Sequence, residues 1–442
     1  MSVSRFSTPA ALLLAAALPL VTTTLSAQPA QPAMAPSATL CPEGLPKTTR
    51  CLSGRDKAGA YYWIAVPAPW NGVLVLHAHG GPELGEPRPD RTAQDMQRWA
   101  VMLRSGYAWA GTSYRQGGVA VRAAGEDVER LRVLFNRTVA LPKLTILHGQ
   151  SWGASVAAKA AEAFPGSYDG VLLTSGVLGG ATRSYDFRLD LRVVYQALCA
   201  NHPLPSEPDY PLWQGLPLGS TLTRAELARR VDACTGVRHP PAERSAAQQT
   251  RLDTLLRVVR IPERSLIEHL SWATWQFQDI VFKRLDGANP FGNVDAFYVG
   301  SPDDEALNAR VARYRADPAA VARFAEDADP TGDISVPVLT LHAIDDPIAF
   351  VELEHGFLDT MTAAGNATHL VQTYTDEHEH SALSGSEYLA AMESLLEWVG
   401  TGERPTPESI ARLCEAQDAS GCHFVPGYRP GPLEQRVTPR LR

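Results

Sequence analysis

The sequence predicts an α/β protein in which a doubly wound, mostly parallel sheet is interrupted by a long, mostly helical insertion. Short apolar runs typical of buried strands alternate with helix-like stretches between about residues 59 and 180. Helical or irregular patterns then dominate until about residue 330, and apolar strand-like runs return at 336–343 and 370–374. Parallel strands need helical crossovers between them, so the alternation favours a parallel sheet and its interruption favours an inserted cap.

The composition is that of a globular protein with one large core. The chain has 442 residues, of which 45% are hydrophobic and 20% are charged. One core domain with a sizeable insertion fits this better than three independent domains. The formal net charge is −8 and no cluster of lysine and arginine occurs, so we do not expect nucleic acid as a partner.

The first 27 residues are typical of a secretory signal peptide. Arg5 supplies one positive charge, residues 10–21 form a short apolar region, and small residues lead to Ala27, after which we expect cleavage. The alternative is an uncleaved anchor, although the apolar run is short for a bilayer. We therefore expect an exported protein, periplasmic or secreted, with no membrane contact after cleavage.

Residues 28–58 are predicted to be a Pro/Ala-rich linker followed by an N-terminal cysteine loop. An even number of cysteines in an exported chain favours disulfides, and no C-x-x-C motif points to a redox site or a zinc ribbon. Six cysteines allow 15 sets of pairs. Proximity in the sequence suggests Cys41 with Cys51, Cys199 with Cys234, and Cys414 with Cys422.

The first half of the predicted core spans residues 59–184. Residues 59–66 alternate aromatic and aliphatic side chains as an early strand does, and a Pro-rich turn follows. The unbroken apolar run that starts at Val73 predicts a buried parallel strand. The remaining elements of this half alternate in type: a helix at 93–105, a strand at 107–112, a helix at 126–135, a strand from 145, and a strand at 168–176.

The motif Gly149-Gln150-Ser151-Trp152-Gly153 lies between an apolar run and an alanine-rich stretch of high helix propensity. So sharp a strand-to-helix turn strains the serine backbone, and Gly149 and Gly153 leave room where strand and helix crowd. The turn exposes the Ser151 hydroxyl and directs the Trp152 backbone N–H toward a developing oxyanion. In these residues the sequence resembles the serine hydrolases of the α/β-hydrolase fold. The alternative is a plain Gly-rich turn.

The apolar run that begins at Val73 ends in His77-Ala78-His79-Gly80-Gly81. In the family that the sequence resembles, a loop of this kind donates the second N–H of the oxyanion hole, because glycines let the backbone approach a bound carbonyl. The resemblance assigns Gly80 and Gly81 to that loop without deciding which one donates. The alternative use of His77 and His79 as metal ligands lacks an evident third ligand.

Arg115 follows the strand at 107–112, at the sheet edge where open α/β sheets bind ligands. Its guanidinium can pair with a carboxylate of the substrate or with one of the protein. Glu126 and Asp127 are the protein candidates, and this structural ion pair is the favoured alternative.

The cap is predicted at residues 185–330, with few strand candidates and no internal repeat. Its predicted helices lie at 189–198, 223–232, 245–259, 265–282, 303–314 and 319–328. Its many aromatic residues suggest a pocket lined by aromatic side chains, most of them forming the core of the cap.

The second half of the core is predicted at 331–402, followed by a structural C-terminal extension at 403–442. His342-Ala343-Ile344-Asp345-Asp346 resembles the family's His-Gly-x-x-Asp strand end, with alanine in place of glycine, which makes Asp346 the acid and Asp345 the reserve candidate. His380 precedes the last predicted helix, at 386–399, and matches the family's catalytic histidine better than His378 does. A metal site at these two histidines is a further alternative.

The order Ser151, Asp346, His380 is the nucleophile, acid, base order of the family. The resemblance implies a serine hydrolase that cleaves a carboxylic ester of a small molecule through an acyl-enzyme, with no cofactor and no metal. One alternative is an exported aminopeptidase of short peptides, since His79-Gly80-Gly81-Pro82 also resembles the oxyanion loop of those enzymes. Such an enzyme needs an acidic cluster for the substrate amine, for which the candidates are Glu207, Asp209, Glu268, Asp303 and Asp304. Another alternative is a non-catalytic binding protein on the same scaffold.

Overall fold

The computed structural model describes residue 1 and residues 36–438. The predicted signal peptide and most of the linker lie outside these described residues. The centre of the molecule is a nine-stranded sheet with the order β1-β2-β3-β5-β4-β6-β7-β8-β9. The strands are β1 (Ser37–Thr39), β2 (Arg50–Arg55), β3 (Tyr61–Val66), β4 (Val73–Ala78), β5 (Ala108–Thr112), β6 (Leu144–Gln150), β7 (Gly170–Thr174), β8 (Val338–Ala343) and β9 (Leu370–Thr375).

Six neighbouring strands of this sheet, from β5 to β9 in the spatial order, are parallel, and β1 to β3 pair antiparallel at one edge. The central strand β6 pairs with β4 and β7, so Gly149 lies opposite Ala78 and Gln150 lies opposite Thr174. The parallel strands therefore end at one edge, where the loops that carry the predicted site residues meet. The predicted doubly wound, mostly parallel sheet is confirmed.

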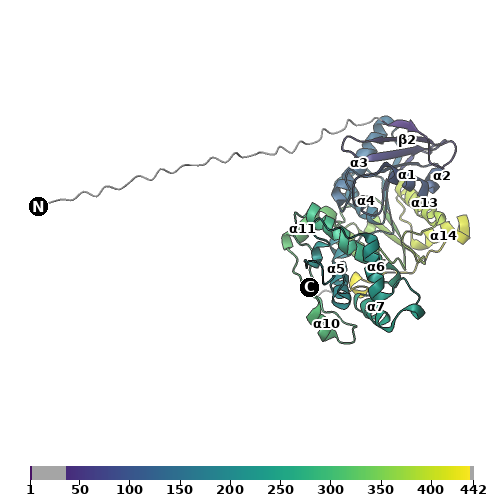
Figure 1. The fold of residues 1–442 in the computed structure, drawn as a ribbon. Coiled ribbons are helices and arrows are strands. Elements are labelled where there is room, and N and C mark those ends of the chain that lie inside the picture. The colour runs from purple at the N-terminus through teal and green to yellow at the C-terminus, as the bar shows by residue number, and fades with distance from the viewer. Residues whose placement is uncertain (2–35, 439–442) are drawn as a thin grey trace.

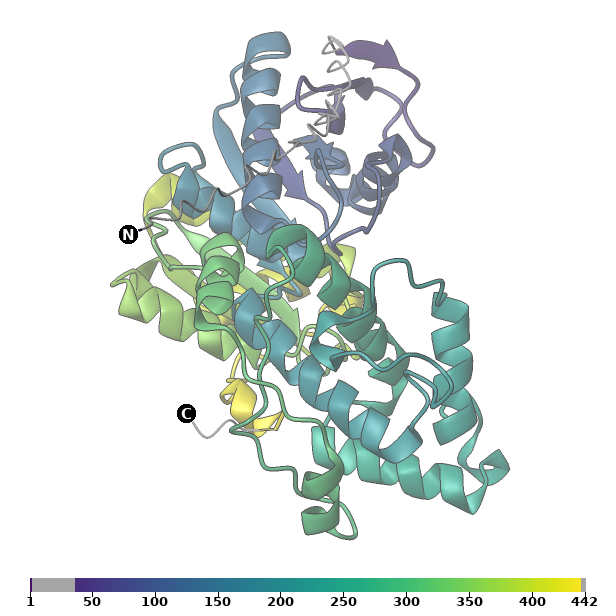
Figure 2. The same cartoon turned by 60° about the vertical axis from the view of Figure 1, so that its left-hand side comes forward.

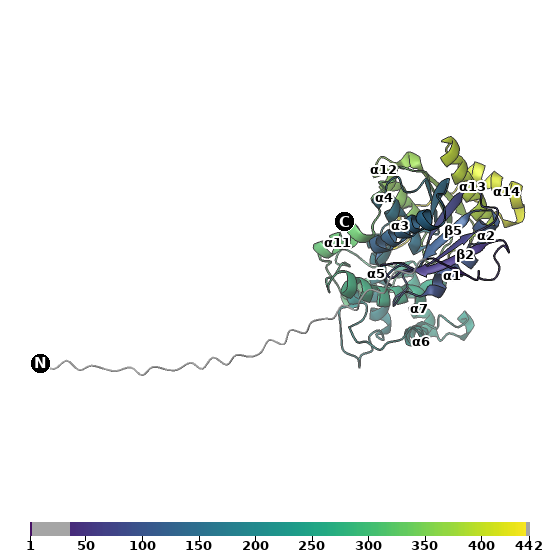
Figure 3. The same cartoon turned by 90° about the horizontal axis from the view of Figure 1, so that it is seen from above.

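Helices cover both faces of the sheet, because successive strand residues point to opposite sides. In β4, Leu74 and Leu76 belong to one apolar core and Val73 and Val75 to the other. Two helices, α3 and α4, lie on one side and α2, α13 and α14 on the other (Figures 1 and 3). The helices around the sheet are α1 (Pro89–Arg98), α2 (Ala100–Arg104), α3 (Val121–Thr138), α4 (Trp152–Ala163), α12 (Leu353–Ala363), α13 (Gly385–Thr401) and α14 (Pro407–Asp418).

A helical insertion separates β7 from β8 and forms its own layer, drawn in teal and green in Figure 2. It continues the apolar core of the α3 and α4 side, since residues from its helices pack into the same cluster. Its elements are α5 (Ala181–Cys199), α6 (Arg224–Thr235), α7 (Ala246–Val259), α8 (Leu266–Ser271), a π-helical turn (Trp272–Gln276), α9 (Phe277–Asp279), a second π-helical turn (Ile280–Arg284), α10 (Asp304–Arg310) and α11 (Pro318–Ala328).

Several elements differ from the sequence prediction, three of them clearly. Residues 50–55, predicted as part of a loop, form the antiparallel strand β2, which lacks an apolar run because half of its side chains are only partly buried. The helix predicted at 93–105 starts at Pro89 and breaks at Trp99, whose backbone leaves the helical region. The helix predicted at 265–282 contains the two π-helical turns, which periodicity does not distinguish from regular helix.

Three disulfides join the pairs that proximity in the sequence suggested, namely Cys41–Cys51, Cys199–Cys234 and Cys414–Cys422. The first ties the chain before β2 to that strand, the second links α5 to α6, and the third ties α14 to the segment that follows it. Among the described residues, none of the helices combines the length and the apolar character that a bilayer crossing requires.

Candidate active site

Ser151 occupies the turn between β6 and α4. Its backbone has φ 57° and ψ −124°, a conformation that non-glycine residues rarely adopt. Backbone hydrogen bonds on both sides hold it there, because the Ser151 N–H donates to Thr174 O at 2.9 Å and the Ala154 N–H donates to Ser151 O at 3.0 Å. The strained backbone that the motif predicted is therefore present and is fixed by its neighbours.

The two glycines of the motif lie where strand, helix and loop are in contact. A Cβ at Gly149 would lie 2.4 Å from Gly153 O and 2.7 Å from the Ala154 Cα. A Cβ at Gly153 would lie 2.1 Å from Ala78 O and 2.5 Å from His79 O, which are backbone atoms at the end of β4. Since real Cβ atoms essentially never come this close to backbone, both positions require glycine.

One chain of hydrogen bonds joins the residues predicted as nucleophile, base and acid. His380 Nε2 lies 2.8 Å from Ser151 Oγ, and His380 Nδ1 lies 2.7 Å from Asp346 Oδ2. These three residues come from the turn after β6, the turn after β8 and the loop after β9. The structure thus brings together side chains that are 229 and 34 residues apart along the chain.

Asp346 is fully buried, and its own turn holds its carboxylate. Asp346 Oδ1 accepts the N–H groups of Ile348 at 2.9 Å and Ala349 at 3.0 Å, while Oδ2 faces His380. Burial alone would raise the pKa of Asp346, but the adjacent His380 and His342 hold it well below its usual value. The group therefore stays ionised and can orient and stabilise a protonated imidazole.

The two reserve candidates occupy a different place. Asp345 pairs with Arg264 at 2.9 Å and lies 3.5 Å from His378. The Asp345 side chain is 44% exposed and the His378 side chain is 77% exposed, whereas Asp346 is buried. The structure therefore joins Asp346 and His380 to Ser151 and places Asp345 and His378 in a solvated ion pair.

The loop after β4 packs directly on the elbow. A Cβ at Gly80 would lie 2.3 Å from Gln150 Oε1 and 2.9 Å from Gln150 O, so only glycine permits this approach. Arg91 Nη2 donates to Gly80 O at 3.1 Å, and His79 Nδ1 lies 2.9 Å from the same oxygen. Because the C=O and the following N–H of a planar trans peptide point in opposite directions, the Gly81 N–H points away from Arg91.

Trp152 is the first residue of α4, so its backbone N–H has no partner within the helix. Its side chain lines a narrow cleft of about 10 Å³ together with His79, Glu83 and Tyr114. The indole Nε1 of Trp152 and Nε2 of His79 have no hydrogen-bond partner within the part of the chain that the structure describes. Burial lowers the pKa of His79 to about 3, so its ring stays neutral, and both of these nitrogens are buried rather than exposed to the cleft.

Arg115 forms ion pairs with carboxylates of the protein, which was the alternative to a contact with the substrate. Its Nη2 lies 2.6 Å from Glu126 Oε2, and its Nη1 lies 2.7 Å from Asp127 Oδ1. Its backbone N–H also donates to Asp127 at 2.5 Å. These contacts occupy the guanidinium and fasten the end of β5 to α3.

His342 supports the acid turn from below, a role that the sequence did not suggest. It is fully buried on β8, with Nδ1 3.1 Å from Glu354 Oε1 and Nε2 2.7 Å from Ala349 O. Burial alone would lower the pKa of His342, but the carboxylates of Asp346 and Glu354 raise it to about 10. The signal in the sequence that could have pointed to His342 is that it belongs to the same motif as Asp346.

The helical insertion holds the same turn from above. Arg188 of α5 donates from Nε to His269 Nδ1 at 3.1 Å, and His269 Nε2 lies 3.0 Å from Pro347 O. Arg188 is buried against the rings of Trp272 and Phe187, and this burial lowers its pKa to about 9. No sequence pattern singled out Arg188 or His269, because their partners lie more than 70 residues away.

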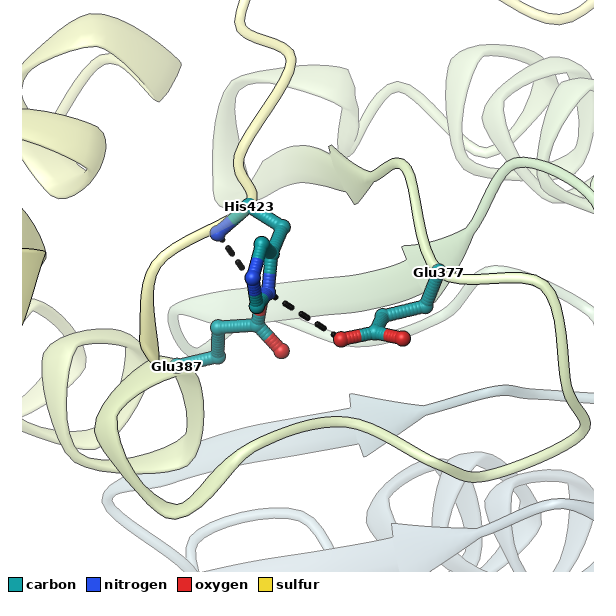
Figure 4. A group of neighbouring side chains, drawn as sticks. All are labelled: Glu377, Glu387 and His423. Atoms are coloured by element: carbon teal, nitrogen blue, oxygen red, sulfur yellow. Dashed lines mark hydrogen bonds and ion pairs between the residues drawn. The ribbon is translucent and has the colours of Figure 1, made fainter. Parts of the chain in front are cut away.

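The histidines considered as metal ligands have other partners. His77 Nδ1 faces His148 Nδ1 at 3.0 Å, whereas His79 faces Gly80 O. Within the described residues, one group of three potential ligands converges: Glu377, Glu387 and His423 (Figure 4). The Glu387 oxygens already accept backbone N–H groups of Ser384 and His423, so these hydrogen bonds account for the cluster.

The acidic residues considered for a substrate amine do not converge. Glu207 pairs with Arg230 at 2.6 Å, Asp303 accepts the Ala306 N–H at the start of α10, and Asp304 accepts the Ser301 N–H. Asp209 accepts its neighbour Tyr210 N–H and Glu268 is exposed.

No family model matches the chain, and no curated protein matches it in sequence. Solved structures with a similar fold include feruloyl esterase B from Aspergillus oryzae, with 13% identity, coverage of 85% of this chain and 88% of that chain, and a TM-score of 0.44. They also include tannin acyl hydrolase from Aspergillus niger, with 11% identity, coverage of 85% and 83%, and a TM-score of 0.43. A third is acylaminoacyl peptidase from Pyrococcus horikoshii, with 10% identity, coverage of 79% and 41%, and a TM-score of 0.37.

Proposed function

We propose that the protein is a serine hydrolase that cleaves carboxylic esters of small molecules. The observation that carries this proposal is the continuous hydrogen-bonded line from Ser151 Oγ through His380 to Asp346, with contacts of 2.8 and 2.7 Å. A buried ionised carboxylate, an imidazole and a serine on a strained turn together make a hydroxyl nucleophilic. Under the proposed function, the strained backbone at Ser151 presents Oγ to the substrate.

The reaction begins when Ser151 Oγ attacks the ester carbonyl carbon and its proton passes to His380 Nε2. Asp346 accepts the His380 Nδ1–H and stabilises the imidazolium that forms. Collapse of the tetrahedral intermediate breaks the C–O bond to the alcohol, which leaves with the proton from His380. Water then attacks the acyl-enzyme with His380 again as base, the carboxylic acid is released, and the proton returns to Ser151.

The developing oxyanion is held by the Trp152 N–H and by an N–H of the Gly80–Gly81 loop. Trp152 offers a free helix N-terminal N–H next to the nucleophile. Within the loop, Gly81 is the better donor, because Arg91 and His79 fix the Gly80 carbonyl and thereby the direction of the Gly81 N–H. Each such donor contributes about 10²- to 10³-fold to the rate.

An ester fits the site better than a peptide with a free amino terminus. The acidic side chains that a bound amine needs are occupied elsewhere in the insertion or are exposed. Export, with cleavage after Ala27, is part of the proposal, and three disulfides support it.

The test is hydrolysis of p-nitrophenyl esters of increasing acyl length and of aminoacyl p-nitroanilides by the wild type and by Ser151→Ala. Ser220→Ala is the matched control, since Ser220 is an exposed serine in the insertion. We expect ester turnover in the wild type and in the control and its loss in Ser151→Ala. Anilide turnover alone would assign the site to peptides, and equal rates in wild type and Ser151→Ala would refute the elbow as nucleophile.

A further inference from the structure

The loop of residues 376–384, between β9 and α13, carries His380 and is held on its inner side by three side chains. Arg98 Nη2 donates to Ser381 O at 2.6 Å, and Gln150 Nε2 donates to Ser381 Oγ. Arg264 of the insertion donates to His378 O at 2.7 Å. These contacts restrain the loop near His380, but none of them reaches the two ends of the loop.

The C-terminal segment of residues 421–425 lies along the outer side of the same loop. The Val425 N–H donates to Tyr374 O at 2.7 Å, and the Asp376 N–H donates to His423 O at 3.0 Å, so the segment pairs with the end of β9 through one antiparallel bridge. At the other end, Ser384 Oγ donates to Gly421 O at 2.5 Å. The Cys414–Cys422 disulfide fastens this segment to α14.

His423 joins the two ends of the loop. Its Nδ1 lies 3.1 Å from Glu377 Oε1 and 3.2 Å from Glu387 Oε1, and Figure 4 shows the ring between the two carboxylates. Glu377 lies near the start of the loop. Glu387 is buried in the first turn of α13 and forms the capping box of that helix with Ser384. Without the histidine the two carboxylates would have no hydrogen-bonding side chain between them.

We propose that His423 is a positioning residue for His380: by clasping Glu377 and Glu387 it closes the loop that presents the catalytic base to Ser151. The proposal rests on the proposed function, in which His380 is that base. A general base acts only within hydrogen-bond reach of the proton it takes, so a loop that opens at its ends lowers kcat while leaving substrate binding unchanged. The clasp thus assigns a catalytic contribution to the C-terminal extension.

Three variants test the clasp. His423→Ala removes it, and His423→Asn restores it in part, because an asparagine amide nitrogen occupies the place of histidine Nδ1 and can donate to both carboxylates. His239→Ala is the matched control: His239 also lies between two carboxylates, Asp232 at 3.3 Å and Glu243 at 3.7 Å, but in the insertion. All three are compared for kcat and KM on a p-nitrophenyl ester and for amide hydrogen exchange of residues 376–384.

We expect His423→Ala to lower kcat about tenfold with KM unchanged, His423→Asn to recover most of this loss, and His239→Ala to match the wild type. Hydrogen exchange in the loop should accelerate in His423→Ala alone. Unchanged kcat and unchanged exchange in His423→Ala would overturn the clasp, as would a loss of kcat that His423→Asn fails to restore. Because exchange is measured without substrate, accelerated exchange in a protein whose wild type cleaves no ester would refute the proposed function and leave the clasp standing.

Discussion

Gly153→Ala tests the crowding on which the elbow depends. In an ordinary helix interior, replacement of glycine by alanine stabilises by about 0.5–1 kcal/mol, because it restricts the unfolded chain. At Gly153 the new Cβ would instead lie 2.1 Å from Ala78 O and 2.5 Å from His79 O, both inside the 3.0 Å below which real Cβ contacts essentially never occur. Relief requires a shift of the chain that leads into Gly80, so we expect a net loss of about 2–3 kcal/mol.

The matched control is Gly125→Ala in α3, the same chemical change in a helix with room for it. Its Cβ would meet Ala160 at 3.4 Å, an ordinary contact, so we expect a small gain in stability. Urea denaturation gives the free energy of unfolding of both variants, and ester hydrolysis gives kcat. Because the displaced chain carries the proposed oxyanion loop, Gly153→Ala should also lower kcat about 10²-fold. Equal stability and equal kcat in the two variants would refute the crowding argument.

Three further outcomes follow from the structure. Asp346→Asn should lower kcat about 10⁴-fold while the protein remains folded, because the amide no longer holds His380 in the right tautomer; steady-state kinetics with circular dichroism checks this. The pKa of His342 is raised from 6.5 to about 10 on folding, so the stability it contributes is fully present below pH 6.5 and is lost as the pH rises through 10; urea midpoints should fall over this range in wild type and stay flatter in His342→Gln. Loss of the Cys199–Cys234 disulfide, which spans 35 residues, should cost about 4 kcal/mol, against about 2.5 kcal/mol for Cys414–Cys422, which spans 8; denaturation of the two double-serine variants decides.

The parts of the fold that could be predicted are those with a strong local pattern. The runs that became β4 and β6 are mostly apolar because both faces of a central parallel strand are buried. The glycines around Ser151 mark a turn whose geometry only glycine allows, so five residues sufficed to locate it. Strand β2 lacked both signals, since it buries only Cys51 and Leu52 among its side chains.

The residues of the candidate site also divide into those that the sequence could predict and those that it could not. Ser151, Asp346 and His380 each follow an apolar strand, and a resemblance to known motifs could order them along the chain. Residues that contact these three only through the tertiary structure have no local sequence motif. Arg188 meets the acid turn through His269, 81 residues further along the chain, and His423 meets Glu387 across 36 residues. Their partners are set by how the insertion and the C-terminal segment fold onto the sheet, which no window of sequence contains.

The placement of these supports explains why the proposed triad needs more of the chain than its own three turns. A hydroxyl nucleophile requires the base to stay within hydrogen-bond reach, yet His380 lies on a loop with no strand or helix of its own. The acid turn is therefore fixed from below by His342 and from above by His269, while the loop of the base is fixed by Arg98 inside and His423 outside. Each support comes from a different part of the sequence, so loss of any one should weaken the geometry at Ser151 without unfolding the sheet that carries it.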